Sequence, residues 1–465
     1  MKQHSTTSKK TFMKATGLDS HGSDIDEIIA SPKAEWKRPW WVRTVDEPTV
    51  EIDWQTVQRF DATKIQQVSF TKYVGKEKRA AINKLKKQRT KQWVLENKPG
   101  YSLRDLALDI AGRQGSVKSS FRGNWYNAAN VVEGFRKRIY TYEELGVPRW
   151  EGTPEENARM IRAAAVNFGA SQVGFVELDE RNRKFVYSID SDGKKLDFEE
   201  VDMAYETENQ RVIPNKVQWA IVFTVQMSEE LYKRRLDKMP TSLSGSTTGL
   251  GYSRARNIFD RLQTFLHVIG YQCLMSPWEN GLGIAPAFGV MAGLGELSRL
   301  NKIISPEYGP TQRVFRMLTD LPLAPTRPID AGIMRFCRTC KKCAIECPSN
   351  ALSTDIEPSW EIKGQWNSPG HRAYFEDGVK CSGYWLGLPA SCSTCMSVCP
   401  FAKKDRTFMH HVVEAIVAKT PLLNGFFTKM DGLLGYDNPK DPESWWDLSL
   451  PIHSIDPTTG TLFDK

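Results

Sequence analysis

The chain has 465 residues, of which 40% are hydrophobic, 25% charged and 11% aromatic, a globular composition with room for two or three domains. Its 63 basic and 55 acidic residues give a formal net charge of +8, too small an excess over this length to indicate nucleic-acid binding by itself. No apolar run approaches the ~18 residues that a membrane-spanning helix needs, so we expect a soluble or peripheral protein.

The first 35 residues predict a polar tail. Within it, SKKTFMKATGL has the spacing of a twin-arginine export signal, with Lys9 and Lys10 where the two arginines would stand. No apolar segment follows, so the tail is either an ordinary polar terminus or a shortened or engineered remnant of such a signal. In both cases we expect that the chain as written does not export itself by that route.

Residues 36–148 form a second region, whose topology the sequence does not define. The region begins with KRPWWV, in which two adjacent tryptophans indicate a segment anchored on the protein. Its stretch from residue 72 to residue 91 is strongly basic. This stretch fits the solvated face of a helix, and it would also suit contact with anionic lipid, RNA or an acidic partner.

Residues 149–328 carry the clearest local signals. Thr153 and Glu156 have the spacing of a capping box around Pro154, so a helix is expected to begin here, and Gly169 is expected to end it. Three buried strands are predicted after this helix, with an acidic insertion before the last of them. They are VGFVEL at 173–178, KFVYSI at 184–189 and WAIVFTVQM at 219–227.

A second amphipathic helix is predicted at residues 252–272. One face carries Ile258, Leu262, Phe265 and Ile269, and the glycines of the preceding TTGLG predict a flexible entry to the helix. The alternation of helices and strands up to residue 230 indicates a layered α/β core. Near the C-terminus, TPLLNGFF and WWDL carry apolar residues that can pack back on this core.

Eight of the nine cysteines lie in two short runs. The first run is C-x2-C-x2-C-x3-C-P and the second is C-x10-C-x2-C-x3-C-P. The first is the pattern of bacterial two-cluster ferredoxins, in which the fourth cysteine of each run binds the cluster of the other run. Structural zinc sites instead use separated C-x2-C pairs. We predict one [4Fe–4S] cluster on Cys337, Cys340, Cys343 and Cys399, and another on Cys347, Cys381, Cys392 and Cys395.

The cysteines indicate electron transfer but do not identify the reaction. The ninth cysteine, Cys273, lies among apolar residues and is expected to be a core thiol. The sequence has no G-x-G-x-x-G after a strand, no P-loop and no C-x-x-C-H for haem. It also lacks D-x-H-x-x-G, which places a histidine on cobalamin cobalt, and its seven histidines form no ligand pattern.

Several segments together resemble the respiratory, corrinoid-dependent reductive dehalogenases, in particular the chloroethene-reducing members. The resemblance covers nearly the whole chain after residue 35 and is weakest at about 55–145. It is carried by RPWWV, WEGTPEEN, the YSR that starts at Tyr252, NGLGIAPAFGVMAGLGELSR, PEYGPTQR, DLPLAPTRPIDAGI, the paired cysteine runs and TPLLNGFF.

This resemblance implies a fold and a set of cofactors. The fold would be a mixed α/β (α+β), nitroreductase-like corrinoid-binding core at 149–328, with an inserted bacterial two-[4Fe–4S] ferredoxin-like module at 329–405. Residues 406–465 would pack on the core, and 36–148 would form part of the corrinoid and substrate pocket, with Trp125 and Tyr126 as candidates. The corrinoid would be base-off, with no histidine on its cobalt.

The resemblance also assigns roles to single residues. Tyr252 resembles the family's proton donor, Asn280 the polar residue near it and Arg313 the cationic partner. A phenol with a pKa near ~10 is a weak acid at neutral pH, and a nearby arginine or helix N-terminus favours its anion. Corrinoid contacts are expected at small residues, with helix packing as the alternative; these are Gly289, Ala292, Gly293 and Gly295.

The implied reaction is organohalide respiration: a reductive dehalogenase removes halide from a chlorinated ethene or ethane, and the clusters relay the electrons. Two alternatives stay open, an epoxyqueuosine reductase acting on tRNA and a ferredoxin-like subunit without catalysis. The family implies a small membrane-anchor protein, a respiratory electron donor, no nucleic acid and a place on the outer face of the cytoplasmic membrane. Without a functional signal the chain as written would be cytoplasmic. The oligomeric state stays open, with a dimer as one option.

Overall fold

The computed structural model describes residues 38–112, 142–143, 146, 148–275, 281–402 and 408–447. The polar tail at 1–35, Trp125, Tyr126 and Asn280 lie outside the described residues. The helices are α3 (Phe70–Val74), α4 (Lys76–Leu95), α5 (Leu103–Gly112), α6 (Pro154–Asn167), α7 (Glu229–Lys233), α8 (Ser242–Ile269), α9 (Ala285–Met291), α10 (Ile333–Cys340), α11 (Lys342–Ile345), α12 (Gly378–Trp385), α13 (Thr394–Ser397), α14 (Phe408–Lys419) and α15 (Asn424–Leu433).

The strands are short apart from those of the central sheet. They are β1 (Arg43–Thr44), β2 (Gln172–Glu177), β3 (Lys195–Glu199), β4 (Tyr205–Glu206), β5 (Gln210–Pro214), β6 (Trp219–Gln226), β7 (Arg235–Leu236), β8 (Met239–Pro240), β9 (Cys273–Leu274), β10 (Glu296–Leu297), β11 (Ile303–Ile304), β12 (Gln312–Thr319) and β13 (Ile329–Asp330).

The central sheet has four strands in the order β2-β6-β12-β9, and each neighbouring pair is antiparallel. The strands predicted at 173–178 and 219–227 are therefore confirmed as β2 and β6. The strand predicted at 184–189 is wrong. A 3₁₀ turn, Asn182–Phe185, occupies its start, and Val186 and Ile189 form isolated bridges to segments outside the central sheet.

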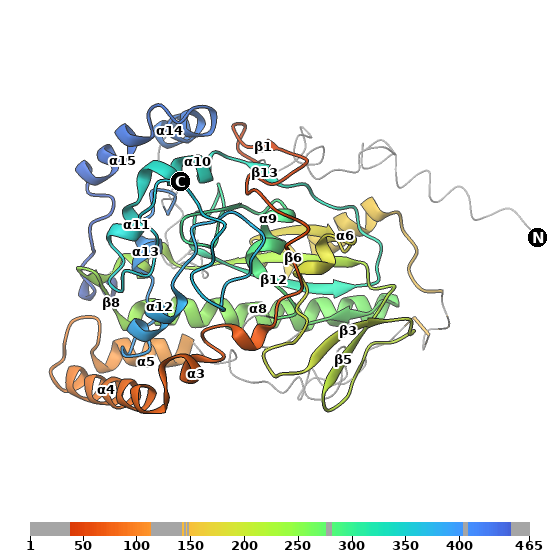
Figure 1. Ribbon diagram of the computed structural model, residues 1–465, viewed down its shortest axis with the longest axis horizontal. Helices are drawn as coiled ribbons and strands as arrows, with labels where there is room; N and C mark the ends of the chain where they lie inside the picture. Colours follow the sequence, from red (N-terminus) through yellow and green to blue (C-terminus); the bar gives the residue numbers. More distant parts are fainter. Residues whose placement is uncertain are drawn as a thin grey trace, which may run out of the picture.

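Helices α6 and α8 cover one face of this sheet (Figure 1). The predicted capping box begins α6, because the Thr153 hydroxyl accepts from the Glu156 amide and the Glu156 carboxylate accepts from the Thr153 amide. Alternate strand residues such as Phe175, Phe223 and Phe315 point to this face, and they pack against Ile258 of α8.

The predicted start of the second helix is wrong. α8 begins at Ser242, ten residues before the predicted start at Tyr252, so TTGLG is helical rather than a flexible entry. Its first turns are buried against α5 and the cysteine segment, where the hydroxyls of Ser242 and Ser244 donate to the carbonyls of Pro389 and Ser391. Burial therefore holds the helix together where glycine and serine lower its intrinsic propensity.

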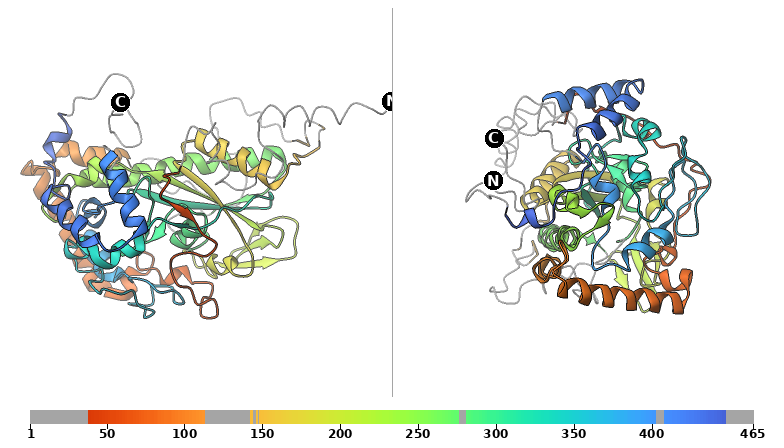
Figure 2. Two further views of the ribbon diagram at one scale, coloured as in Figure 1. Left: turned by 90° about the horizontal axis from the view of Figure 1, so that it is seen from above. Right: turned by 90° about the vertical axis from the view of Figure 1, so that its left-hand side faces the viewer.

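The opposite face of the sheet packs on α9 and belongs to a core that continues into the cysteine segment. Val222 on β6, Phe288 on α9, and Phe336 beside the first cysteine are members of one buried cluster. The cysteine segment and α14 and α15 gather at one end of the molecule, whereas β3 and β5 lie at the other end (Figures 1 and 2). Mixed helix and strand content agrees with the predicted class, and the nitroreductase-like likeness stays a prediction.

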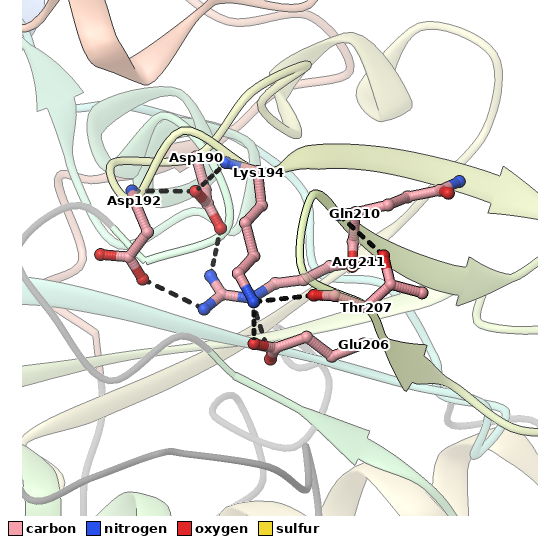
Figure 3. A network of polar contacts seen from close by, with 7 residues as sticks. All are labelled: Asp190, Asp192, Lys194, Glu206, Thr207, Gln210 and Arg211. Atoms are coloured by element: carbon pink, nitrogen blue, oxygen red, sulfur yellow. Dashed lines mark hydrogen bonds and ion pairs between the residues drawn. The ribbon is translucent and has the colours of Figure 1, made fainter.

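The acidic insertion folds into its own three-stranded sheet, β3-β5-β4. Arg211 on β5 forms ion pairs with Asp190, Asp192 and Glu206, and Lys194 also pairs with Glu206 (Figure 3). The network joins the turn before β3 to β4 and β5. The buried carboxylate of Asp190 therefore has a cationic partner in Arg211.

The basic stretch and the C-terminal segment both lie on the surface. α4 carries most of the basic stretch and has no buried residue, which agrees with a solvated helix face. In the C-terminal segment, the Trp446 indole donates to Asp105 of α5 at 2.7 Å and Asn424 is buried on α15, while packing on the 149–328 core stays a prediction. Leu422 is 87% exposed and does not pack on the core. In the described part of the chain, no helix is long and apolar enough to cross a membrane.

Gly309 joins the core to the cysteine segment at a close backbone approach. Its φ is +59°, and a Cβ placed there would lie 1.9 Å from the carbonyl oxygen of Phe401. We expect Gly309→Ala to lower the free energy of unfolding by about 2–5 kcal/mol, because left-handed strain and a clash with the backbone add together. Gly193→Ala is the control, since φ there is +85° but no atom lies within 4 Å. Thermal unfolding of both variants would show equal losses if the clash contributes nothing.

Candidate functional site

A cavity of about 630 Å³ lies between the central sheet and the cysteine segment. Its walls come from α8, α9 and β12 and from the loops around residues 347–352 and 366–371. Most of the lining side chains are apolar, with a few polar groups among them, as is usual for a small-molecule site. Tyr252 and Arg313, which the sequence singled out, both line this cavity.

Tyr252 and Arg313 form a hydrogen-bonded pair across α8 and β12. The Nη1 atom of Arg313 donates to the Tyr252 hydroxyl oxygen at 3.0 Å, and the guanidinium lies 4.4 Å from the centre of the tyrosine ring. Arginine cannot accept a hydrogen bond, so the tyrosine's own O–H stays free to donate elsewhere. The geometry therefore places the Tyr252 hydroxyl oxygen next to a cation.

The ring of Tyr252 is held by the sheet below it. It meets Phe315 edge-on at 6.0 Å, and Phe315 stacks on Phe223 at 5.5 Å. One expectation about this tyrosine is wrong: it lies in the interior of α8 rather than at its N-terminus, because the helix starts at Ser242. The dipole effect fades beyond the first turn, so the charge next to the Tyr252 oxygen comes from Arg313 rather than from a helix N-terminus.

The four small residues expected to contact a corrinoid do not line the cavity. A Cβ on Gly289, Gly293 or Gly295 would meet Ile303, the Arg327 carbonyl or the Ile304 carbonyl, and Ala292 is buried. These residues contact other parts of the protein, which agrees with the alternative prediction that they serve packing. Their neighbours on and before α9 face the cavity instead; these are Ile284, Ala285, Pro286, Ala287, Val290 and Met291.

The cysteines of the first predicted cluster lie together and away from the cavity wall. Burial raises the pKa of the Cys343 thiol, and Cys337, Cys399, Cys395 and Cys340 raise it further. Burial also raises the pKa of the Cys399 thiol, and the neighbouring Cys337 and Cys340 raise it further. A bare thiolate is therefore disfavoured here, and bound iron would supply the missing positive charge. Cys399, which closes the second run, interacts with Cys337 and Cys340 of the first run, and the crossed ligand assignment stays a prediction.

The other four cysteines line the cavity itself; they are Cys347, Cys381, Cys392 and Cys395. Burial raises the pKa of the Cys392 thiol, and Cys347 raises it as well, so the last cysteine of the first run lies with the second run. The Ala351 amide donates to the Cys347 sulfur at 3.4 Å. Among the described residues, no three histidines, cysteines or carboxylates converge on the position of a single metal ion. A [4Fe–4S] cluster does not need such convergence, because each thiolate binds a different iron.

Two buried residues that sequence reasoning missed hold α10, the helix of the first two cysteines. The carboxylate of Glu296 accepts from the amides of Ala331 and Ile333 at 2.8 and 2.9 Å and so caps the helix start. Arg299 is 1% exposed and donates from Nε and Nη2 to the Cys337 carbonyl at 2.9 and 2.7 Å. Both residues lie in the segment GELSR, residues 295–299. Their role could not be predicted from the sequence, because it depends on their burial next to α10.

We expect Arg299→Met to destabilise the first cluster site. Its Nη1 atom also donates to the carbonyls of Ser353 and Asp355 at 2.7 Å, so the variant leaves the buried Cys337 carbonyl and these two part-buried carbonyls without this donor. The buried carbonyl alone costs about 1–3 kcal/mol, which should lower Tm and the iron bound per chain. Arg338→Met is the matched control, because that side chain is 41% exposed and forms a long ion pair with Glu357 at 3.5 Å. Equal iron loss in both variants would contradict the role of Arg299.

Three further cavity residues were not predicted. Arg316 on β12 and Tyr187 are each 4% exposed and line the cavity. The sequence could have indicated Arg316, because a charged residue in a buried strand is unusual. His371 also lines the cavity; burial lowers its pKa to about 4, so the ring is neutral at pH 7. The expectation that no histidine binds cobalt stays a prediction, as does the role of Asn280, which lies outside the described residues.

Family models and curated relatives both indicate the reductive dehalogenases. Residues 37–195 match the model described as a reductive dehalogenase subunit, and residues 336–402 match the 4Fe–4S double cluster binding domain. A chloroethene reductive dehalogenase from Dehalococcoides mccartyi strain VS is 30% identical over 98% of this chain and 100% of its own length. A tetrachloroethene reductive dehalogenase from Sulfurospirillum multivorans is 34% identical over 65% of this chain and 61% of its own.

A solved structure shares the fold. The reductive dehalogenase whose structure suggests a mechanism for B12-dependent dehalogenation aligns with a TM-score of 0.58 at 20% identity. The alignment covers 93% of this chain and 57% of that one, so the chain spans somewhat more than half of that protein. The double-cluster match confirms the nature of the cysteine segment that its spacing predicted.

Proposed function

Because the chain belongs to the reductive dehalogenase family, we propose that it removes halide from a small chlorinated ethene or ethane, with Tyr252 as the proton donor. The observation that carries this proposal is the Tyr252–Arg313 pair, which lies in the same cavity as four cysteine thiols. The reaction takes two electrons and a proton and replaces the carbon–halogen bond by a carbon–hydrogen bond.

The cavity fits the corrinoid that this chemistry needs. The side-chain amide of Gln312 lines the cavity, and both its polar atoms are buried without a hydrogen-bond partner among the described residues. A corrinoid carries amide groups at its rim, which can satisfy such atoms, and flat apolar contacts are available from Val290, Met291 and Val314. When bound, the corrinoid supplies low-valent cobalt as the electron source that no side chain provides.

Tyr252 and Arg313 divide the proton transfer between them. The free O–H of Tyr252 donates its proton to the carbon that loses the halogen. As the proton leaves, negative charge develops on the oxygen that already accepts from Arg313 at 3.0 Å, and the fixed guanidinium stabilises it. Asn280, by family resemblance, would add a polar contact nearby.

We place the cluster held by Cys347, Cys381, Cys392 and Cys395 next to the corrinoid, because these thiols line the cavity. The other cluster, further from the cavity, is then the point where electrons enter from a respiratory donor. From the family we also propose a small membrane-anchor partner and a location on the outer face of the cytoplasmic membrane.

Anaerobic reconstitution tests the proposed function. The holoprotein, with corrinoid, iron and sulfide determined, is given reduced viologen and a panel of chlorinated ethenes and ethanes. We expect chloride release from at least one of them. A fully loaded protein that releases no halide, or that reduces epoxyqueuosine in tRNA, would contradict the proposal.

A further inference from the structure

The cavity contains a second arginine, Arg316, two of whose nitrogens are without a hydrogen-bond partner among the described residues. Arg316 lies three residues after Arg313 on β12, and its Nε and Nη2 atoms are buried without a hydrogen-bond partner in the described part of the chain. Burial lowers the pKa of Arg316 to about 10, and the groups that oppose this shift are Tyr187 and Tyr252 rather than a carboxylate. At neutral pH the side chain is therefore a buried cation without a counter-charge among these groups.

Arg316 lines the same cavity as Tyr252 and Tyr187. These two tyrosines are the groups whose electrostatic interaction favours the charged form of its side chain. A Cβ on Gly281 would lie 2.7 Å from Nη2, so the chain covers the guanidinium there. The cavity's cysteine side has its own cation, Lys302, which is already neutralised by Glu376 at 2.8 Å.

An uncompensated buried charge costs free energy, so its retention requires an anion that binds it. The proposed reaction produces one at this place, because the carbon–halogen bond breaks with its electron pair on the halogen. Arg313 already donates from Nη1 to Tyr252, and only its Nε is a buried nitrogen without a partner among the described residues, whereas Arg316 has two such nitrogens, Nε and Nη2. Burial raises the pKa of Tyr187 to about 12, so its hydroxyl stays protonated and can donate as well.

We propose that Arg316, with Tyr187 beside it, binds the halide ion released from the substrate. This inference rests on the proposed function and assigns the second product of that reaction to a site. The balance is complete: two electrons come from the reductant, the proton passes from Tyr252 to carbon, and the halide passes to Arg316. Arg316 is then a product-binding residue, distinct from the proton-transfer pair.

Bromide is the probe that tests this site. Crystals of the holoprotein soaked in bromide should show an anomalous peak in contact with Arg316, and bromide should inhibit turnover as a product. Arg316→Met keeps the length and apolar stem of the side chain without its charge. We expect it to lose the peak and to weaken bromide inhibition by about 10–100-fold, the range for one charged hydrogen bond. Arg316→Lys should restore part of both.

The outcomes separate this inference from the proposed function. Bromide inhibition that is unchanged in Arg316→Met, or a peak elsewhere in the cavity, would overturn the halide site while leaving dehalogenation intact. Loss of corrinoid from Arg316→Met with unchanged bromide binding would show that the arginine holds an anionic part of the cofactor, which also overturns it. If the wild-type holoprotein releases no halide, the function fails, and the scattering experiment still decides whether Arg316 binds bromide.

Discussion

Tyr252→Phe is expected to lower turnover by about 10²–10⁴-fold while the corrinoid, iron and sulfide contents stay unchanged. The substitution removes only the hydroxyl, and the ring keeps its edge-on contact with Phe315 at 6.0 Å. Arg313 then has no phenol oxygen to stabilise, and the O–H that we propose as proton source is gone. Chloride release under reduced viologen measures the effect.

Tyr271→Phe is the matched control for this prediction. Its hydroxyl donates to the Trp150 carbonyl at 2.8 Å, and the residue does not line the cavity. We expect a stability loss of about 0.5–1.5 kcal/mol and unchanged turnover. Full activity of Tyr252→Phe, or an equal loss in both variants, would exclude Tyr252 as the proton donor.

The second large effect concerns the crossed cysteines. Cys399→Ala is expected to remove the cluster of Cys337, Cys340 and Cys343, and Cys347→Ala the cluster of the other run, each with about four of eight irons. Electron delivery to the cavity stops in both, so turnover should fall below detection. Iron and sulfide determination on anaerobically purified protein measures the loss.

Double variants distinguish the crossed pattern from two separate runs. If Cys337 and Cys399 bind the same cluster, the double alanine variant loses about four irons, whereas Cys337→Ala with Cys347→Ala loses all eight. Separate runs would give the reverse result. Cys273→Ala is the control, because this thiol is fully buried beside Met317 and should leave the iron content unchanged.

Sequence and structure agreed where the chemistry is local. The capping box at Thr153 and Glu156 needs only residues three apart, and C-x2-C spacing fixes ligands within one turn. The predictions failed where distant packing decided the outcome. α8 starts at Ser242 because α5 and the cysteine segment bury a stretch of low helix propensity, and Phe185 ends a turn because its carbonyl accepts from Ile284.

The sequence by itself determined that this protein has enough cysteine ligands for two iron–sulfur clusters. Through its resemblance to a known family, it also indicated Tyr252 and Arg313 as site residues. Only the tertiary structure decided that Tyr252 and Arg313, 61 residues apart, share a hydrogen bond. It also decided that Gly289, Gly293 and Gly295 pack on protein, and that Arg316 lines the cavity with Nε and Nη2 unpartnered among the described residues. The physical reason is that spacing encodes contacts within a turn of chain, whereas burial and the pairing of charges depend on which segments the fold brings together.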